Sequence, residues 1–309
     1  MQHFYGLEDV ALDAAWLTIG SFDGVHIGHR QIIEKLTAGA HKVGAPAVVL
    51  TFSPHPAVVL RGVQSAYYLT TPEEKAHLLG ELGVDIVITH PFNQEVAAIE
   101  AEDFMRTLNQ HLKLEQLWIG YDFALGRNRG GDAAALRKIG LALGYRVEEV
   151  NPYQVKDRIV SSSRIRKLLE EGKVEEAADY LNRPYQVSGL VIKGDGRGKT
   201  IGIPTANIEI AKEKMMPAAG VYACYVWVEG QRYPAVTNVG VRPTFESDPV
   251  PPRVEPHILE FDRQIYGKTI TVEFIARLRA EKKFDGIQAL VSQIHIDIDQ
   301  ARQLFAEDV

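Results

Sequence analysis

Two kinds of apolar pattern alternate along the first half of this 309-residue chain. Short runs rich in Val, Ile and Leu predict strands, and they alternate with segments of about ten to fifteen residues whose apolar positions recur at helical spacing. This alternation is typical of βαβ units and of a parallel sheet covered by helices on both faces. The predicted strands are Trp16–Ile19, Ala47–Phe52, Asp85–Thr89, Gln116–Ile119 and Tyr145–Val150, and the predicted helices are His29–Val43, Pro72–Leu82, Ala101–Gln110, Gly131–Leu143 and Ser162–Glu171.

The pattern changes near Leu181–Pro184, because strands separated by turn residues dominate the rest of the chain. Short strands at this spacing predict a compact antiparallel β-barrel. We therefore expect an α/β Rossmann-like domain over residues 1–182 and a small barrel domain over residues 183–309. The predicted strands of the barrel are Tyr185–Lys193, Gly220–Val228, Gln231–Val239, Val254–Phe261 and Thr269–Leu278, followed by a closing helix from about Gly286 to Phe305.

Composition narrows the class of protein further. Apolar residues make up 46% of the chain and charged residues 24%, which is ordinary for a globular protein, and the net charge of −6 argues against a nucleic-acid-binding protein. The single cysteine, Cys224, excludes an internal disulfide framework and a cysteine-based metal cluster. The first residues carry no basic and apolar leader, and no apolar run approaches the ~20 residues that span a bilayer. We expect a cytoplasmic protein with neither nucleic acid nor membrane as a partner.

A glycine-rich turn between the first strong strand and its helix is the strongest candidate for chemistry. Backbone N–H groups and the helix dipole at such a turn attract phosphate, and the two histidines after it, His26 and His29, can donate hydrogen bonds to phosphate oxygens. The glycine spacing does not fit the dinucleotide fingerprint, and the histidine spacing does not fit a zinc site. A pair of solvated histidines is the ordinary alternative. The H-x-G-H sequence resembles that of the nucleotidyltransferase superfamily, which binds a nucleotide triphosphate there. The candidate phosphate-binding residues are Gly20, Phe22, Asp23, Gly24, His26 and His29.

Three later segments of the first half also predict ligand contacts. Thr51–Pro56 is expected to form a rigid, non-helical turn at the binding edge of the sheet, although such a turn needs no function. Ile119–Asp132 combines two arginines with four glycines and predicts a phosphate-binding loop, with a solvated basic loop as the alternative. Val160–Arg166 places serines at a helix start, and an arginine there opposes the helix dipole unless an anion is bound.

In the second half, Gly194–Thr200 resembles a P-loop but is one residue out of register, since Lys193 stands where glycine is required. It precedes Pro204–Asn207, where Thr205 and Asn207 offer oxygen donors on one side of an extended segment. Hard oxygen donors beside a glycine-rich loop suit Mg²⁺ bound to nucleotide phosphates. Without further context, Pro-Thr-Ala-Asn would be an ordinary turn.

Taken together, these motifs resemble the bacterial bifunctional riboflavin kinase/FMN adenylyltransferases. The first half carries F-D-G-x-H-x-G-H, P-H-P, a G-x-D-F loop and an S-S-S-x-I-R helix start. The second half carries P-T-A-N, N-x-G-x-R-P-T-F, V-E-x-H-I, Y-G-K and L-R-x-E-x-x-F in the order of that family's kinase module.

The resemblance implies ATP- and Mg²⁺-dependent phosphorylation of riboflavin to FMN by the second domain, and adenylylation of FMN to FAD by the first. It implies Glu255 as the kinase base, Thr205 and Asn207 as metal-binding residues, and His26 and His29 in adenylyl transfer. It further implies nucleotide contacts at Ser161, Ser162, Ser163 and Arg166 in the first domain and at Gly194, Gly196, Arg197, Gly198, Lys199, Pro204, Thr205 and Asn207 in the second. Flavin contacts are implied at Phe52, His55, Asp122 and Phe123, and at Arg279, Glu281 and Phe284.

The implied ligands are ATP, riboflavin, FMN and FAD, with flavins as substrates and products and no permanently bound prosthetic group. Flavin-requiring apoproteins are candidate acceptors of the product. Two alternatives stay open. One is a nucleotidyltransferase for another phosphorylated precursor, such as pantetheine phosphate or nicotinamide mononucleotide, which leaves the second half unexplained. The other is a non-catalytic flavin-binding regulator.

Overall fold

The computed structural model describes residues 1–63, 66–155, 158–194, 196, 198, 201–240 and 253–307. The chain divides into two compact units, Met1–Ser162 and Ser163–Val309. Each unit has its own sheet and its own apolar core, so each is described by itself.

The first unit is built on a six-stranded parallel sheet with the order β1-β4-β3-β2-β5-β6. The strand order reverses at β2, since β3 lies on one side of it and β5 on the other. Ligands of doubly wound sheets bind beyond the carboxyl ends of the strands at this reversal. The strands are β1 (Gln2–Phe4), β2 (Ala15–Ile19), β3 (Ala47–Ser53), β4 (Ile86–Pro91), β5 (Leu114–Gly120) and β6 (Arg146–Val150).

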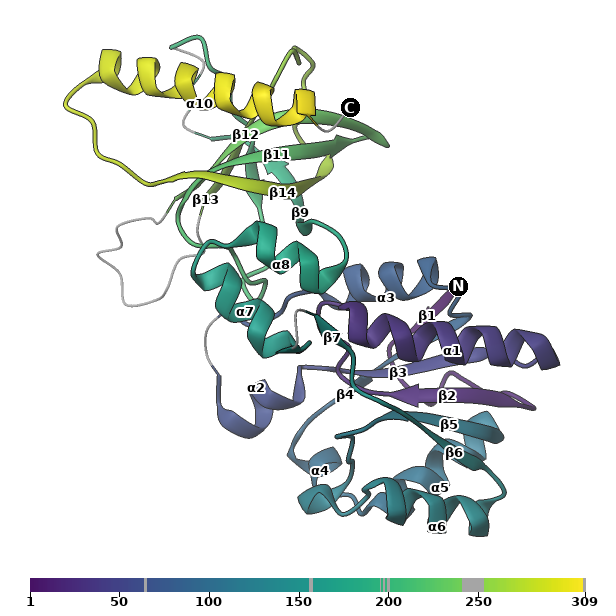
Figure 1. Cartoon of the computed structure of the whole chain (residues 1–309). Coiled ribbons are helices and arrows are strands. Elements are labelled where there is room, and N and C mark those ends of the chain that lie inside the picture. Colours follow the sequence, from purple (N-terminus) through teal and green to yellow (C-terminus); the bar gives the residue numbers. More distant parts are fainter. Residues whose placement is uncertain are drawn as a thin grey trace. The chain divides into compact units, whose positions relative to one another are not determined.

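Helices cover both faces of this sheet, as the alternating pattern predicts (Figure 1). Helices α1 (Ile27–Val43) and α3 (Pro72–Glu81) pack on one face, and α5 (Ala101–Leu112) and α6 (Ala133–Leu143) pack on the other. The central strands serve both cores because successive side chains point to opposite faces. In β3, for example, Val48 and Leu50 join the core under α5 and α6, whereas Ala47 and Val49 join the core under α1 and α3.

Local capping chemistry explains where the main helices begin and end. Thr71 and Glu74 form a reciprocal capping box at the start of α3. Helix α1 is capped by the side chain of His26 and ends at Gly44, whose φ of 76° is left-handed.

Several short elements were not predicted, because a strand or helix of a few residues shows no full hydrophobic period. The prediction that the whole segment Thr51–Pro56 is non-helical is wrong at its end, since Pro56 begins a helix, a position where proline is favoured. The short elements are β1, α2 (Pro56–Arg61), α4 (Gln94–Ala97), the pair β7 (Gln154–Val155) and β8 (Arg158–Ile159), α8 (Val174–Leu181) and β10 (Asn207–Glu209).

The second unit contains the predicted antiparallel barrel, which is closed in the order β10-β13-β12-β11-β14-β9. Strand β10 completes the closure by pairing with both β9 and β13. Helix α10 (Ile287–Glu307) lies across the outer face of the barrel, where Ile298 and Ala301 pack on Val221 and Ala223 (Figure 1). The remaining strands are β9 (Tyr185–Ile192), β11 (Gly220–Val228), β12 (Gln231–Gly240), β13 (Arg253–Ile258) and β14 (Thr269–Ala280).

Two helices before the barrel bear on the domain boundary. Helix α8 is joined to β14, since Glu175 Oε1 accepts a hydrogen bond from the backbone N–H of Arg277. Helix α7 (Ser162–Glu170) also belongs almost wholly to the second unit. The boundary between residues 182 and 183, placed from the change to a strand-dominated pattern, stays a prediction.

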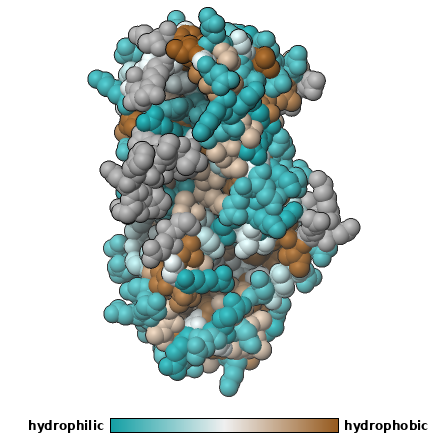
Figure 2. Space-filling model, turned by 90° about the vertical axis from the view of Figure 1, so that its left-hand side faces the viewer, coloured by the Kyte–Doolittle hydropathy of each residue, from teal (hydrophilic) through white to brown (hydrophobic). Residues whose placement is uncertain are grey.

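The surface in Figure 2 is mostly hydrophilic, and its apolar residues form separate small groups. Across the described ranges, no helix is both long and apolar enough to cross a membrane.

Candidate functional site

The two histidines of the glycine-rich turn lie face to face at the start of α1. His26 is the N-cap residue, and its Nδ1 accepts a hydrogen bond from the backbone N–H of His29 at 3.2 Å. The two imidazole rings stack with centroids 3.5 Å apart, and the edge of Phe22 meets His29 at 5.2 Å. Because Nδ1 of His26 is an acceptor, a neutral His26 carries its proton on Nε2 and can donate it to a ligand.

His29 is held in its neutral form. Burial, and then the nearby charges of His26 and Lys75, hold the pKa of His29 well below its usual 6.5. Its Nδ1 atom is buried and has no hydrogen-bond partner in the part of the chain that the structure describes. A buried ring nitrogen without a partner is costly unless a ligand satisfies it, so this atom fits contact with a phosphate oxygen.

Asp23 was predicted to bind phosphate, but its carboxylate is turned to the chain itself. It is 1% exposed and accepts hydrogen bonds from the backbone N–H groups of Leu69 and Thr70 and from the Thr70 hydroxyl, at 3.1–3.3 Å. Thr70 Oγ1 in turn accepts the N–H of Gly24 at 3.0 Å. Asp23 therefore holds the turn against residues 69–70, a role suited to a carboxylate that would repel an anion.

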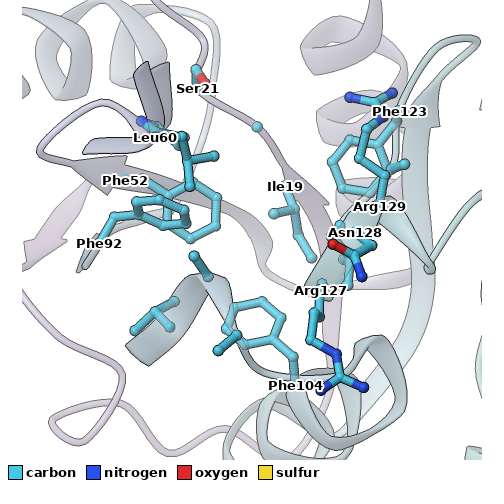
Figure 3. Close-up of a pocket in the computed structure, with 18 of the residues that line it drawn as sticks. Ile19, Ser21, Phe52, Leu60, Phe92, Phe104, Phe123, Arg127, Asn128 and Arg129 are labelled. Carbon is cyan, nitrogen blue, oxygen red and sulfur yellow. The ribbon is translucent and has the colours of Figure 1, made fainter. Parts of the chain in front are cut away.

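A cavity of about 720 Å³ opens beside this turn, at the carboxyl ends of β2, β3 and β5. In Figure 3 the rings of Phe52 and Phe92 lie together on one wall, with centroids 5.3 Å apart, and Phe123 lies on the opposite wall. The volume falls within the roughly 300–1,000 Å³ of small-molecule sites, and the aromatic walls suit a flat ring system. Of the predicted contacts, Gly20, Phe52, Asp122 and Phe123 line the cavity; the prediction missed Phe92, Phe104 and Leu60.

Phe92 could have been anticipated, because it directly follows β4 at the same edge of the sheet. Phe104 and Leu60 lie inside helices, where an apolar residue is normally read as core. His55 is not among the residues that line the cavity. Its Nδ1 accepts the N–H of Ala57 at 3.0 Å and thereby caps α2.

The predicted basic loop forms the polar rim of the same cavity (Figure 3). Arg129 donates from Nη2 to the carbonyl oxygen of Asp122 at 2.8 Å, and Arg127 forms an ion pair with Glu100. Asn128 and Arg129 have positive φ values of 54° and 59°, which non-glycine residues adopt only when their surroundings hold them there. The loop is thus a strained, tethered rim that carries two guanidinium groups.

The serine-rich helix start approaches the glycine-rich turn at one point. Ser162 Oγ donates a hydrogen bond to the backbone oxygen of Asp23 at 2.8 Å. Ser161 is half-buried and precedes α7. Ser163 and Arg166 belong to the second unit, and their part in nucleotide binding stays a prediction.

The second unit brings the kinase-like motifs together on the barrel. A Cβ placed on Gly194 would lie 2.0 Å from Asn207 Nδ2, and one on Gly198 would lie 2.3 Å from the carbonyl oxygen of Ile203 and 3.4 Å from Thr205 Oγ1. Because these glycines carry no side chain, the backbone of this loop can lie directly against the two predicted oxygen donors, and we call the loop the glycine cradle. Gly196 has a φ of 70°, whereas Arg197 and Lys199 lie outside the described residues.

Glu255 lies next to this cradle. Because Ile208 pairs with Val254 in antiparallel register, Asn207 lies opposite Glu255 and on the same face of the sheet. Glu255 also pairs with Asn238 of β12, and its Oε1 lies 3.6 Å from Arg253 Nη1. Pro204 extends the cradle, since its carbonyl oxygen lies 2.8 Å from His257 Nδ1. Asn238, whose position opposite Glu255 appears only in the fold, was not predicted as a site residue.

These donors fit a magnesium ion that arrives with a nucleotide. Thr205 and Asn207 supply neutral oxygens, which are suitable ligands but carry no charge to bind the metal alone. No cluster of three His, Cys, Asp or Glu side chains suitable for a metal occurs among the described residues.

Arg279 was predicted to contact flavin, but its guanidinium is engaged within the protein. Its Nε and Nη2 atoms donate to the carboxylate of Asp297 on α10 at 2.9–3.1 Å, and Asp297 is 1% exposed. The same guanidinium lies over the ring of Phe284, 5.6 Å from its centroid. A Cβ on Gly240 would lie 2.9 Å from Glu281 Oε1, so Glu281 approaches the end of β12. Arg279 thus orients Phe284 and anchors α10, and flavin contacts at Glu281 and Phe284 stay predictions.

Comparison with known protein families gives two matches that together span most of the chain. Residues 9–164 match the FAD synthetase family model, and residues 181–305 match the riboflavin kinase model.

Individual relatives cover nearly the full length. The bifunctional riboflavin kinase/FMN adenylyltransferase of Listeria monocytogenes is 35% identical over 94% of this chain and 92% of its own length. That of Escherichia coli is 33% identical over 97% of this chain and 96% of its own. A crystal structure described as a macrolide-efflux protein from Streptococcus pneumoniae is 30% identical and superposes with a TM-score of 0.88, over 97% of this chain and 98% of its own.

Proposed function

This chain belongs to the family of bifunctional riboflavin kinases/FMN adenylyltransferases, and we propose that its second unit phosphorylates riboflavin to FMN and its first unit adenylylates FMN to FAD. The assignment of one reaction to each unit rests on the presence of two separate sites, each on its own unit. One joins a phosphate-binding turn to an aromatic cavity, and the other joins a carboxylate to oxygen donors and a glycine cradle.

In adenylyl transfer, the flavin ring lies between Phe52 and Phe123, and the ATP triphosphate lies at the start of α1. A phosphate oxygen of FMN attacks the α-phosphorus of ATP, the bond to the β-phosphate oxygen breaks, and pyrophosphate leaves. The attacking oxygen is already anionic, so no base or protein nucleophile is required. The work of the protein is to position the reactants and to stabilise charge on the phosphates.

A neutral His29 is suited to this task. His26 and His29 contribute N–H donors, and the N-terminus of α1 contributes backbone N–H groups and a positive dipole. The contribution of His29 to triphosphate binding then rests on hydrogen bonding rather than on imidazolium charge. Ser161 and Ser162, the last residues of the first unit, complete the nucleotide contacts in this proposal.

In the kinase reaction, Glu255 accepts the proton of the ribityl 5′-hydroxyl as the hydroxyl oxygen attacks the γ-phosphorus of ATP. The bond from the γ-phosphorus to the bridging oxygen breaks, and ADP leaves. Thr205 and Asn207 would hold Mg²⁺ together with the nucleotide phosphates, and the ion supplies charge neutralisation of those phosphates. The close approach of Gly194 and Gly198 to these two side chains supports this assignment, because it brings the backbone of a glycine-rich loop to the proposed metal-binding oxygens.

One assay tests the assignment as a whole. Purified full-length protein is incubated with riboflavin, ATP and Mg²⁺, and flavins are separated by HPLC. We expect FMN to appear first and FAD to follow at its expense. Formation of FMN alone would remove the adenylyl-transfer assignment, and no conversion at all would favour a flavin-binding regulator.

A further inference from the structure

Lys75 is a lysine buried within the first unit, in the middle of α3. Its side chain is 4% exposed, and Nζ donates a hydrogen bond to Thr51 Oγ1 at 3.0 Å. Thr51 in turn donates to the backbone oxygen of Ser21 at 3.0 Å. The ammonium group is therefore connected through one side chain to the backbone of the glycine-rich turn.

The turn is strained and needs such support. Phe22 and Val25 have φ values of 44° and 40°, in the left-handed region that L-residues avoid and β-branched residues avoid most. These two residues flank Asp23 and Gly24 and lead directly into His26, so their conformation decides where the histidine pair is presented. The restraints on the turn include the Thr51 bond to Ser21 and the Asp23 contacts to residues 69–70.

The electrostatic surroundings of Lys75 come from three other elements. Asp23 of the turn is the acidic group that faces it, and His29 of α1 and His3 of β1 are the titratable bases that respond to its charge. Burial lowers the pKa of Lys75 to about 8, and Asp23 opposes that shift. Because the unfolded chain binds this proton more tightly, a charged Lys75 opposes folding at neutral pH. An apolar side chain would fill the site without this cost, so the charge calls for a functional explanation.

We propose that Lys75 is a positioning residue for adenylyl transfer: its buried ammonium group, acting through Thr51 and Asp23, holds the strained turn in the form that presents His26 and His29 to the nucleotide triphosphate. This inference rests on the proposed assignment of adenylyl transfer to the first unit.

The test replaces Lys75 with methionine, which keeps the length of the side chain and removes the charge. Adenylylation of FMN and phosphorylation of riboflavin are measured on the same full-length preparation, so the kinase is the internal control for the amount of active protein. The Tm reports whether the first unit stays folded. In Lys75→Met we expect kcat/KM for FMN adenylylation to fall by about 10- to 100-fold, as misplacement of reacting groups by ~1 Å does. We expect kinase activity within about 2-fold of wild type and a Tm that is unchanged or higher. Lys42→Met, which removes an exposed lysine at the far end of α1, is the matched control and leaves both activities unchanged.

A pH profile separates a charge effect from a packing effect. Wild-type adenylylation falls as the pH rises past about 8, because Lys75 loses its proton, and Lys75→Met lacks this decline. A double-mutant cycle with Asp23→Asn tests the route, since two residues that act through one another give non-additive losses. The proposal would be overturned by unchanged adenylylation in Lys75→Met, or by a decline of activity above pH 8 that persists in this variant. Additive losses of activity in the double-mutant cycle, or loss of both activities with a lowered Tm, would also overturn it.

His29→Ala distinguishes this failure from failure of the site assignment. If His29→Ala still forms FAD, the proposed adenylyl-transfer site is wrong. If FAD formation is lost in His29→Ala but retained in Lys75→Met, only the proposed role of Lys75 is wrong.

Discussion

The imidazole rings of His26 and His29 stack with centroids 3.5 Å apart, and the backbone N–H of His29 binds the ring nitrogen of His26. This contact links the cap of α1 to the orientation of both rings. The pair therefore behaves as one rigid unit at the carboxyl end of β2, where the strand order of the sheet reverses.

Loss of one ring should disable one reaction only. We expect His29→Ala to lower FMN adenylylation by about 100- to 1,000-fold, the size of effect seen when one preorganised donor is removed from a charged transition state. Riboflavin phosphorylation should be unchanged, and Glu255→Ala should give the opposite result. Each reaction is assayed separately, with FMN or riboflavin as the starting flavin. Parallel loss of both reactions in a folded His29→Ala protein would contradict the two-site assignment.

The glycine cradle of the barrel predicts a kinase defect from a single methyl group. In Gly194→Ala the new Cβ would collide with the amide of Asn207, so we expect the KM for ATP in riboflavin phosphorylation to rise by about 10-fold or more. Gly286→Ala is the matched control, because a Cβ there meets nothing within 4 Å. Equal kinetics for the two variants would show that Asn207 can move aside and that the cradle is not needed.

The buried pair of Arg279 and Asp297 predicts a stability effect in the second unit. Removing one partner of a buried ion pair leaves the other charge unpaired, so Asp297→Ala should cost about 3–5 kcal/mol of unfolding free energy. Asp299→Ala on the same helix removes only an exposed contact with Arg302 and should cost less than about 1 kcal/mol. Urea unfolding followed by Trp227, the tryptophan of this unit, measures both. If Asp297→Ala proves no more costly than Asp299→Ala, then Arg279 is free for flavin after all.

Acid should destabilise the first unit. The pKa of His29 is held below 6.5 in the folded chain by burial, so the unfolded chain binds more protons as the pH falls below about 6.5. The unfolding free energy that His29 contributes above pH 6.5 is then lost on acidification. The full loss is about 1.4 kcal/mol for each pH unit by which the pKa of His29 in the folded chain lies below that in the unfolded chain. His3 and His90 shift in the same direction.

Unfolding free energies at pH 7.5 and 5.5 test this effect, with His29→Gln as the variant that cannot titrate. We expect a smaller loss in His29→Gln than in the wild type. A wild-type protein that is equally stable at both values, or a variant with the same loss, would show that His29 is not kept neutral by the fold.

The sequence by itself determined the class of both units and the position of the glycine-rich turn. Hydrophobic period, capping residues and glycines act locally, so α3 with its capping box and β11 with its bounds could be predicted from the sequence. The motifs that carry the family resemblance, in the first half and in the second, are likewise runs of neighbouring residues.

Only the tertiary structure decided which distant side chains meet. Phe92 and Phe104 join Phe52 in one cavity, Asp23 turns from the phosphate site to Thr70, and Arg279 pairs with Asp297. Lys75 looks like any helix lysine until its Nζ is found at Thr51, 24 positions away. Local patterns carry no record of such contacts, because the energy of a buried charge or an aromatic wall depends on what the fold packs around it.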